Sequence, residues 1–396
     1  MNGHPGPATG GERASARAAG LIGTLDAAAA RIDAARELPA DVLAEMHAAR
    51  IFRVLLPRSV GGDEATLTEF AETIENLAIG DASAAWVASQ GGGCALAAAF
   101  LSEEAAERWF GPPDAVLAWG AGIQGKAVRV EGGYRVTGTW TFASGSRHAT
   151  ILGGHSYVVD AAGAPILRDD GSKLDRTVLL RRDQADIEDT WRVMGLKGTG
   201  SDAFAVTDLF VAEADTVDRE NLAELREPGT IFKFPGTVVY GVGFSALQLG
   251  IARAMLNHLR DLALVKTPRG VSVSLRENPV FQQTLARLEA RLRAARAYLI
   301  GSTDAAYAAV AARGEIAVQE RMDLKLASVH VIHEGVDIVE AAYRAAGSTA
   351  IFESGPFERR LRDALTASQQ TQARAQNFVT LGRMLLDLEP ESWTFL

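Results

Sequence analysis

The sequence has a single cysteine, Cys94, and few aromatic residues, which fill 7% of its 396 positions. One cysteine excludes an intramolecular disulfide, and no clustered His and Cys pattern indicates a metal site. His330 and His333 are three residues apart in a predicted helix, but no set of carboxylates supports a metal there. No run of about 18 apolar residues occurs, so we expect no membrane span.

Positive charge is also scarce, with 40 Lys and Arg against 49 Asp and Glu and a net charge of −9. This balance argues against a nucleic-acid-binding surface. The opening residues, MNGHPGPATGGER, lack the apolar core of a signal peptide. We therefore expect residues 1–14 to form a flexible tail and the protein to be cytoplasmic.

Three common motifs of enzyme sequences are missing. No GxGxxG opens a βαβ unit and no GxxxxGK[ST] is present, so classical dinucleotide and P-loop sites are not supported. No Gly-x-Ser-x-Gly elbow occurs, and the serines of FASGS (142–146) fall in a predicted β region rather than at a strand-to-helix turn. A serine hydrolase is therefore a poor fit.

The chain changes character twice along its length, which predicts three domains. Residues 15–114 have helical periodicity, for example at Leu67, Phe70, Ile74 and Leu77. Residues 115–225 contain short strands at 151–159, 175–182 and 202–211, typical of a small antiparallel barrel or sandwich. Residues 226–396 are helical again, with predicted helices at about 320–346 and 360–386 and an interruption at Leu275–Pro279.

The stretch GGYRVTGTWTFASG (132–145) begins as a hairpin and then combines large aromatic side chains with serine and glycine. Val128 and Val130 alternate before the Gly132-Gly133 turn, and the alternation resumes after it. The mixture that follows has two interpretations. Trp140 and Phe142 are either ordinary barrel core or a surface against a flat aromatic cofactor.

Four sequence motifs, taken together, resemble those of the acyl-CoA dehydrogenase superfamily, and the resemblance covers roughly residues 20–390. They are GDASAAWV (80–87), the stretch at 132–145, WRVMGLKGTGSDAFAVTDLFV (191–211) and FERRLRDA (357–364). The resemblance implies an α+β fold with an N-terminal helical domain, a central antiparallel β-barrel or sandwich and a C-terminal four-helix bundle. It also implies a flavin whose ring packs against the strand at 132–145.

The resemblance assigns residues to this flavin site. We expect apolar contact from Trp140 and Phe142 and polar contact from Ser144, where glycine permits close backbone approach. Arg269 resembles an arginine that reaches the flavin phosphate of a neighbouring subunit, a role that suits a guanidinium. The predicted cofactor-binding residues are Trp140, Phe142, Ser144, Gly145, Thr199, Ser201, Arg269, Gly347 and Ser348.

The superfamily holds dehydrogenases and monooxygenases, and the base that a dehydrogenase needs is not evident here. Arg362-Asp363 is followed by ALTASQQTQARAQ, so Thr371 stands near the position of the family's catalytic glutamate. The other known location also lacks a glutamate, since Asp261 is the only acid between Pro228 and Arg276. A hydroxyl cannot take the proton of a carbon acid.

GLKGTGSDAF and GDASAAWV look more like the reduced-flavin monooxygenase branch, which includes phenol, dibenzothiophene and amine oxygenases. The resemblance implies a separate flavin reductase, O₂, and a C4a-(hydro)peroxyflavin in a dry pocket. Reduced FAD or FMN would be bound non-covalently in a homo-oligomer, as a tetramer or dimer. The alternatives are an acyl-CoA dehydrogenase or oxidase with a displaced base and a non-catalytic member of the fold.

Related phenol hydroxylases carry a histidine where this chain has Gln370, and another near the place of Cys94. This departure favours a substrate that needs no ring deprotonation, such as an amine or an indole. We predict Ser144, Gln370 and His148 as catalytic residues. His148 is equally explained as a strand-end histidine bonded to backbone.

Overall fold

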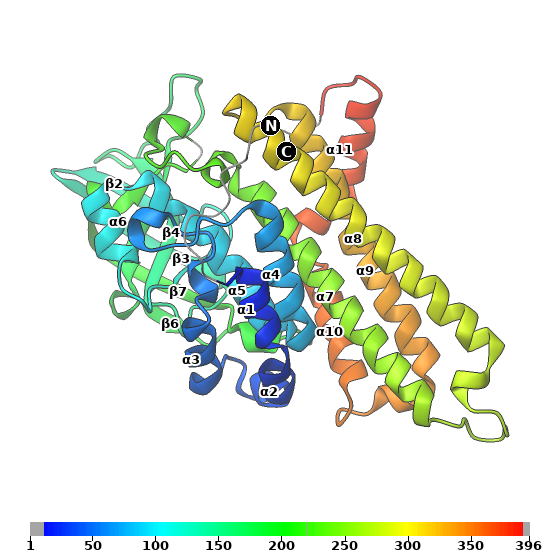
Figure 1. Cartoon of the computed structure of the whole chain (residues 1–396). Coiled ribbons are helices and arrows are strands. Elements are labelled where there is room, and N and C mark those ends of the chain that lie inside the picture. Colours follow the sequence, from blue (N-terminus) through cyan, green and yellow to red (C-terminus); the bar gives the residue numbers. More distant parts are fainter. Residues whose placement is uncertain (1–11, 220, 391–396) are drawn as a thin grey trace.

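The computed structural model describes residues 12–219 and 221–390 and has helical, β and helical regions in chain order (Figure 1). The N-terminal helices are α1 (Ala14–Gly20), α2 (Ile22–Ala35), α3 (Ala40–Ala48), α4 (Leu67–Gly80), α5 (Ala82–Ala95) and α6 (Glu103–Phe110). The C-terminal helices are α7 (Gly236–Val265), α8 (Pro279–Arg313), α9 (Val318–Ala346), α10 (Pro356–Ala367) and α11 (Gln376–Leu385). This order confirms the predicted α+β class.

The predicted domain limits at 114/115 and 225/226 stay a prediction, although every strand of the described residues lies between Leu117 and Val217. Of the predicted tail, residues 1–11 lie outside the described residues. The last residue of that tail, Ala14, is already the first of α1.

Side-chain caps mark the first turns of α4 and α5, the two helices that meet at the GDASAAWV motif. The Thr66 hydroxyl accepts from the Glu69 N–H at the start of α4, 3.1 Å away. Asp81 ends α4 in extended conformation, and its carboxylate accepts from the Ala84 N–H at 2.9 Å to begin α5. The apolar stripe of α4 is buried as its spacing predicts, and α5 is buried along almost its whole length.

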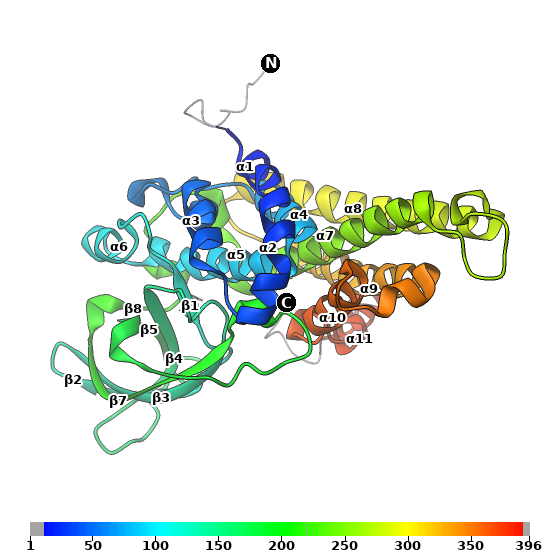
Figure 2. The ribbon, with the colours of Figure 1, turned by 90° about the horizontal axis from the view of Figure 1, so that it is seen from below.

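The β region is one twisted sheet lying to one side of the helices, while α7 and α8 extend away from it (Figure 2). Its strands are β1 (Leu117–Trp119), β2 (Gly125–Val130), β3 (Gly133–Ala143), β4 (Ile151–Val159), β5 (Asp175–Arg181), β6 (Asp186–Glu188), β7 (Asp202–Ala212) and β8 (Thr216–Val217). The order is β6-β7-β3-β2-β4-β5-β8, with β1 beside β4. The predicted strands at 151–159, 175–182 and 202–211 are confirmed.

The hairpin at β2 and β3 is also confirmed, but the sheet is mixed rather than purely antiparallel. Val130 pairs with Gly133 across the turn, where Gly132 has a φ of 77°. After β3 the chain crosses to the other side of β2, where β4 pairs with β2 in parallel. Strand β1 pairs with β4 in parallel as well. The sequence shows strand positions, whereas the parallel pairs depend on which neighbour each strand selects.

Helix α7 is the central helix of the molecule, packed against α4, α5, α8, α9 and α10. Among the described residues it is the one helix long and apolar enough to cross a membrane, and 83% of its most apolar window is buried inside the protein. Packing on several sides accounts for that composition, because a helix surrounded by others is apolar all round.

The last predicted helix, 360–386, is wrong as a single element. α10 ends at Ala367 and α11 starts at Gln376, with a short 3₁₀ turn, Thr371–Ala373, between them. Side chains stabilise the break. The Gln370 side chain accepts from the Gln372 N–H, and Asn377 donates to the carbonyl oxygens of Thr371 and Gln372. Amide groups that bond the local backbone compete with the helix ladder.

Candidate active site

The FERRLRDA motif of α10 forms hydrogen bonds with the segment that contains the GLKGTGS motif. The buried Asp363 carboxylate accepts from the Leu196 N–H at 2.7 Å. Arg362 donates to the Met194 carbonyl oxygen at 2.5 Å and is held by Glu358, one helical turn earlier. Gly195 lies so close to Arg362 that a Cβ there would stand 2.2 Å from its carbonyl oxygen. The C-terminal bundle therefore positions residues 194–199 of the β region.

From this segment a chain of three hydroxyls, Thr199, Ser201 and Ser144, crosses to the N-terminal helices; we call it the hydroxyl chain. Thr199 Oγ1 lies 2.7 Å from Ser201 Oγ, which lies 2.7 Å from Ser144 Oγ. The indole N–H of Trp86, on α5, donates to Ser144 Oγ at 2.9 Å. All three hydroxyls are buried. Side chains of the N-terminal helices and of the β region thus meet at Ser144.

The hydroxyls of this chain all donate their hydrogen bonds in the same direction, from Ser144 toward Thr199. The Leu196 carbonyl oxygen can only accept, so Thr199 directs its hydrogen there, at 2.8 Å. Ser201 must then donate to Thr199, and Ser144 must donate to Ser201. Because Ser144 already accepts from Trp86, one lone pair remains on its oxygen. Ser144 is therefore suited to one further N–H or O–H donor, and not to donating itself.

The structure corrects the expectation for Trp140. Its side chain is fully buried, stacks on Phe204 with ring centroids 5.1 Å apart, and donates its N–H to the His155 carbonyl oxygen. Gly125 and Gly154 pack against the indole so closely that a Cβ on either would approach it within 2.5 Å. Trp140 belongs to the core of the sheet and is not available to a flavin ring.

Phe142 and His148, by contrast, lie near Ser144 in positions open to a ligand. Phe142 is 61% exposed and left-handed, with a φ of 60°, and its ring meets Trp191 edge-on. His148 packs beside Gly145, and its Nε2 is buried without a hydrogen-bond partner. Burial lowers the pKa of His148 to about 4, with smaller contributions from nearby positive groups. This imidazole is neutral near pH 7.

Arg269, Gly347 and Ser348 form a separate group at the far end of the bundle. Arg269 is exposed on the loop between α7 and α8, which Figures 1 and 2 both show at the end of the helices away from the sheet. Lys266 joins this loop to the turn after α9, donating to the Ala346 carbonyl oxygen at 2.6 Å. These residues do not meet Ser144 within one chain. Their flavin role stays a prediction that requires a second subunit.

Gln370 lies in the break between α10 and α11. Its oxygen accepts from the Gln372 N–H at 2.6 Å, while its Nε2 is buried without a partner. Thr366 Oγ1, one turn earlier, is also buried without a partner. Buried donors are rarely left without a hydrogen-bond acceptor, which a ligand or a water molecule can provide. The amide supplies a donor here, but no ionisable base.

Sequence reasoning missed an aromatic row, formed by Trp86, Phe244 and Tyr240, that starts at Ser144 and follows α5 and α7. Trp86 stacks on Phe244 with centroids 4.3 Å apart, and Phe244 stacks on Tyr240 at 5.9 Å. The Tyr240 hydroxyl ends the row 3.5 Å from Cys94 Sγ. The spacing Tyr240–Phe244 and the Trp in GDASAAWV were the available signals, but residues on two helices show no joint pattern in a sequence.

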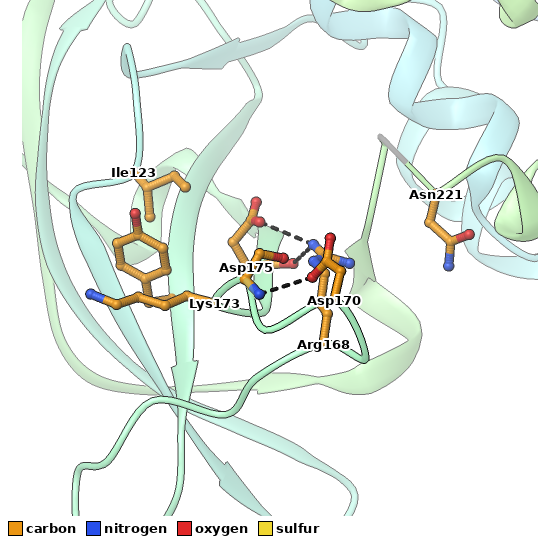
Figure 3. Close-up of a pocket in the computed structure, with 8 residues that line it drawn as sticks. Ile123, Arg168, Asp170, Lys173, Asp175 and Asn221 are labelled. Carbon is orange, nitrogen blue, oxygen red and sulfur yellow. Dashed lines mark hydrogen bonds and ion pairs between the residues drawn. The ribbon is translucent and has the colours of Figure 1, made fainter. Parts of the chain in front are cut away.

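A pocket of about 620 Å³ opens on the β region (Figure 3). None of the residues predicted for the flavin site lines it. Arg168, on one of its walls, is held by Asp175 at 3.0 Å and by Asp218. Ile123 and Asn221, which belong to the segments after β1 and β8, form other parts of the lining.

Asp363→Asn is expected to remove a pH dependence of stability. Burial, followed by repulsion from Asp81, raises the pKa of Asp363 to about 7. The folded state therefore holds this proton more tightly than the unfolded state, and stability falls as pH rises from roughly 4 to about 7. Asparagine keeps an acceptor for Leu196 N–H but does not titrate. Unfolding curves from pH 5 to 8 should show wild type losing about 2–3 kcal/mol more than the variant.

The control for this comparison is Asp41→Asn, because Asp41 is exposed and pairs only at the surface with Arg31. Its melting temperature should follow that of the wild type across the same range. Parallel curves for wild type and Asp363→Asn would show that the buried carboxyl does not titrate as inferred.

The residues around Ser144 fit one edge of a flavin. The hydroxyl chain leaves an acceptor free on Ser144, and His148 Nε2 is a buried polar atom without a partner beside Gly145. Gly145 has a φ of 84°, which a side chain rarely allows, so the backbone turns sharply after the strand. Reduced flavin has the N–H donor and the flat ring that these groups suit.

Comparison with known proteins shows the family of the chain. The chain matches the model for the acyl-CoA dehydrogenase N-terminal domain over residues 22–112 and that for the C-terminal domain over residues 242–374. It is 33% identical to an indole-3-acetate monooxygenase of Pseudomonas putida over 360 residues, 90% of each chain. It is 26% identical to the oxygenase subunit HsaA, a flavin-dependent monooxygenase of Rhodococcus jostii, over 87% of this chain and 90% of the relative.

The fold is shared with XiaF from a Streptomyces species, solved with FADH₂ and glycerol. The TM-score is 0.88 at 22% identity, with 96% of each chain covered. The named relatives are monooxygenases, which decides against the dehydrogenase or oxidase alternative. The chain belongs to the acyl-CoA dehydrogenase superfamily, in its flavin-dependent monooxygenase branch, and is the oxygenase component of a two-component monooxygenase.

Proposed function

We propose that this oxygenase inserts one oxygen atom into an electron-rich nitrogen heteroaromatic ring of the indole type. The observation that carries the proposal is the aromatic row leading from Ser144 along α5 and α7. Flat, apolar side chains at stacking distance from one another suit a flat aromatic substrate. The 33% identity to an indole-3-acetate monooxygenase supports the same substrate class.

Among the described residues, the carboxylate nearest in the sheet to Ser144 is that of Asp202, and it is occupied by Arg147 and by the N–H groups of Thr190 and Trp191. The lack of a free base there supports a ring that reacts without deprotonation. Phenol hydroxylation benefits from a group that takes the phenolic proton, and such a group needs a pKa near the working pH. His148 has its pKa lowered to about 4 and Gln370 does not titrate. The indole ring is already electron-rich as the neutral molecule, so it needs no such base.

Reduced flavin, when bound with O₂, would supply an electrophilic oxygen atom for the substrate. In our proposal Ser144, Gly145, Thr199 and Ser201 hold the polar edge of the flavin. Ser144 accepts a hydrogen bond through its remaining lone pair, since its own hydrogen goes to Ser201. Phe142 lies beside the ring, while His148 and Gln370 donate from the surrounding wall. The burial of the three hydroxyls and of the His148 and Gln370 nitrogens excludes water from this edge.

We further propose that the flavin, FAD or FMN, binds non-covalently and that a separate reductase delivers it in the reduced form. Arg269, Gly347 and Ser348 would then come from a neighbouring chain. The group lies at the end of α7 and α9 beside exposed apolar side chains, including Leu264, Val265 and Phe352. Such a patch favours association. We propose a homotetramer in the cytoplasm.

Oxygen consumption tests the proposed activity. The protein is mixed with NADH, a flavin reductase, FAD or FMN, and indole-3-acetate, and isotopically labelled O₂ is used to trace the product by mass spectrometry. We expect substrate-dependent O₂ uptake and one labelled oxygen atom in the product. An acyl-CoA added anaerobically to the flavin-loaded protein serves as the control and should not bleach the flavin. Peroxide as the sole product with every indole and phenol tested would contradict the substrate class.

A further inference from the structure

Arg219 has a buried nitrogen atom and, unlike Arg360, no ion-pair partner among the described residues. It lies just after β8, half-buried, and its Nε is buried without a hydrogen-bond partner. Among residues 12–219 and 221–390 no carboxylate forms an ion pair with it, although its neighbour Asp218 pairs with Arg168. A guanidinium has five N–H donors and no acceptor, so an unpaired one in a partly buried site suits an anionic ligand.

Among the described residues, the side chain in ring contact with Arg219 is aromatic, and the neighbouring acid, Asp218, is paired with Arg168. Its guanidinium carbon lies 4.2 Å from the centroid of the Trp119 ring, which also meets His155 edge-on at 4.9 Å. Gly236 leaves room for it, because a Cβ there would stand 2.9 Å from Arg219 Nη1. The positive charge contributes to lowering the pKa of His155 to about 3, after the larger effect of burial. No described group nearby neutralises the charge.

Arg219 lies at the end of the aromatic row opposite Ser144. The point that a Gly236 Cβ would occupy is 2.9 Å from Arg219 Nη1 and 4.0 Å from Tyr240 Cε2. Gly93, on α5, faces the same Tyr240 ring so closely that a Cβ would approach it within 2.3 Å. The row therefore runs from the hydroxyl of Ser144 to the guanidinium of Arg219.

The two segments that carry Trp119 and Arg219 continue into the pocket of Figure 3. Ile123 follows Trp119 after four residues, and Asn221 follows Arg219 after two; both line that pocket. Arg219 itself does not line this pocket, so the pocket and the guanidinium are neighbours along the chain.

We propose that Arg219 binds the carboxylate of an aromatic carboxylic acid whose ring lies on the aromatic row, and that it selects such acids over neutral rings. This inference rests on the proposed function, since it names the acidic group of the indole-type substrate. A carboxylate accepts two parallel N–H bonds from a guanidinium, which gives both affinity and orientation. Arg219 thereby determines substrate specificity and takes no part in the oxygen transfer.

The test compares indole-3-acetate with indole-3-acetamide, which has the same shape but no charge. Binding to the flavin-free protein is measured by calorimetry, and KM and kcat are measured in the complete system. Wild type should bind the acid at least about 30-fold more tightly than the amide, and Arg219→Met should lose that preference with little change for the amide. Arg219→Lys should retain part of it, because the charge remains.

Arg135→Met is the matched control, since Arg135 also lies over an aromatic ring, that of Phe210, on the exposed side of β3. It should leave the acid preference unchanged. Equal weakening of acid and amide in Arg219→Met would show a purely structural role and overturn the proposal. So would a wild type that does not prefer the acid, a comparison that holds even if Arg219→Met does not fold.

The two proposals fail separately. A wild type that binds the acid through Arg219 but releases only peroxide contradicts the proposed oxygenation and leaves the carboxylate site standing. A wild type that oxygenates acid and amide with equal kcat/KM contradicts the carboxylate site and leaves the indole oxygenase standing.

Discussion

Replacing Arg360 with alanine is expected to lower the free energy of unfolding by about 3–5 kcal/mol, the largest stability effect that we predict for a single side chain. Arg360 is only 2% exposed. Its guanidinium donates to three consecutive carbonyl oxygens, those of Ala78, Ile79 and Gly80, at 2.8–2.9 Å. These are the last carbonyls of α4, which have no partners within their helix. A positive charge at a helix C-terminus is also favourable.

Denaturant unfolding, followed by far-ultraviolet circular dichroism, measures the loss. Arg359→Ala is the matched control, because Arg359 is the adjacent arginine on α10 and makes no side-chain hydrogen bond with the described residues. It should change stability by less than about 1 kcal/mol. Arg360→Lys should fall between the two, because an ammonium cannot reach all three carbonyls at once. Equal midpoints for the two alanine variants would refute the capping role.

The largest expected effect on activity is that of Ser144→Ala. The hydroxyl is expected to accept from the flavin, and its removal also leaves the buried Trp86 N–H without an acceptor. Such a loss is worth about 1–3 kcal/mol, or roughly one to two orders of magnitude in a rate or affinity. We expect more hydrogen peroxide released per NADH consumed and a weaker affinity for reduced flavin, with the fold retained.

Ser146→Ala separates this effect from a general loss of packing. Ser146 is equally buried, stands two residues along the chain, and donates to the Gly200 carbonyl oxygen at 3.0 Å. It should lower the melting temperature to a similar extent while the ratio of product to peroxide stays that of the wild type. If both serine variants give the wild-type ratio, Ser144 has only a structural role.

The local parts of the fold were predictable from the sequence because their signals are local. The Gly132-Gly133 turn sets the hairpin, and the limits of β4 agree with the expected strand at 151–159. Alternation holds as far as Trp140, which is buried like Tyr134 and Val136, and fails at Phe142 for a physical reason. A register shift between Trp140 and Ala143 interrupts the pairing with β7, and Phe142 adopts a positive φ. An interrupted strand no longer shows two faces by simple alternation.

The candidate site was predictable only where the resemblance supplied a motif. Ser144, Thr199 and Ser201 come from two such motifs, and the structure brings their hydroxyls together. Arg219 carries no motif. Its distinguishing property is a buried Nε without a hydrogen-bond partner among the described residues, which appears only when the neighbours in space are known. Arginine is common in this chain, so the residue type alone gave no signal.

The hydroxyl chain also has a consequence for the order in which the protein matures. It depends on Trp86, on residues just after β3 and just before β7, and, through Leu196, on Asp363 in α10. During synthesis the N-terminal helices and the sheet leave the ribosome first and begin to fold as units. The segment at 194–199 gains its anchor only when α10 has emerged. A nascent or truncated chain that ends before α10 therefore lacks the anchor of the hydroxyl chain.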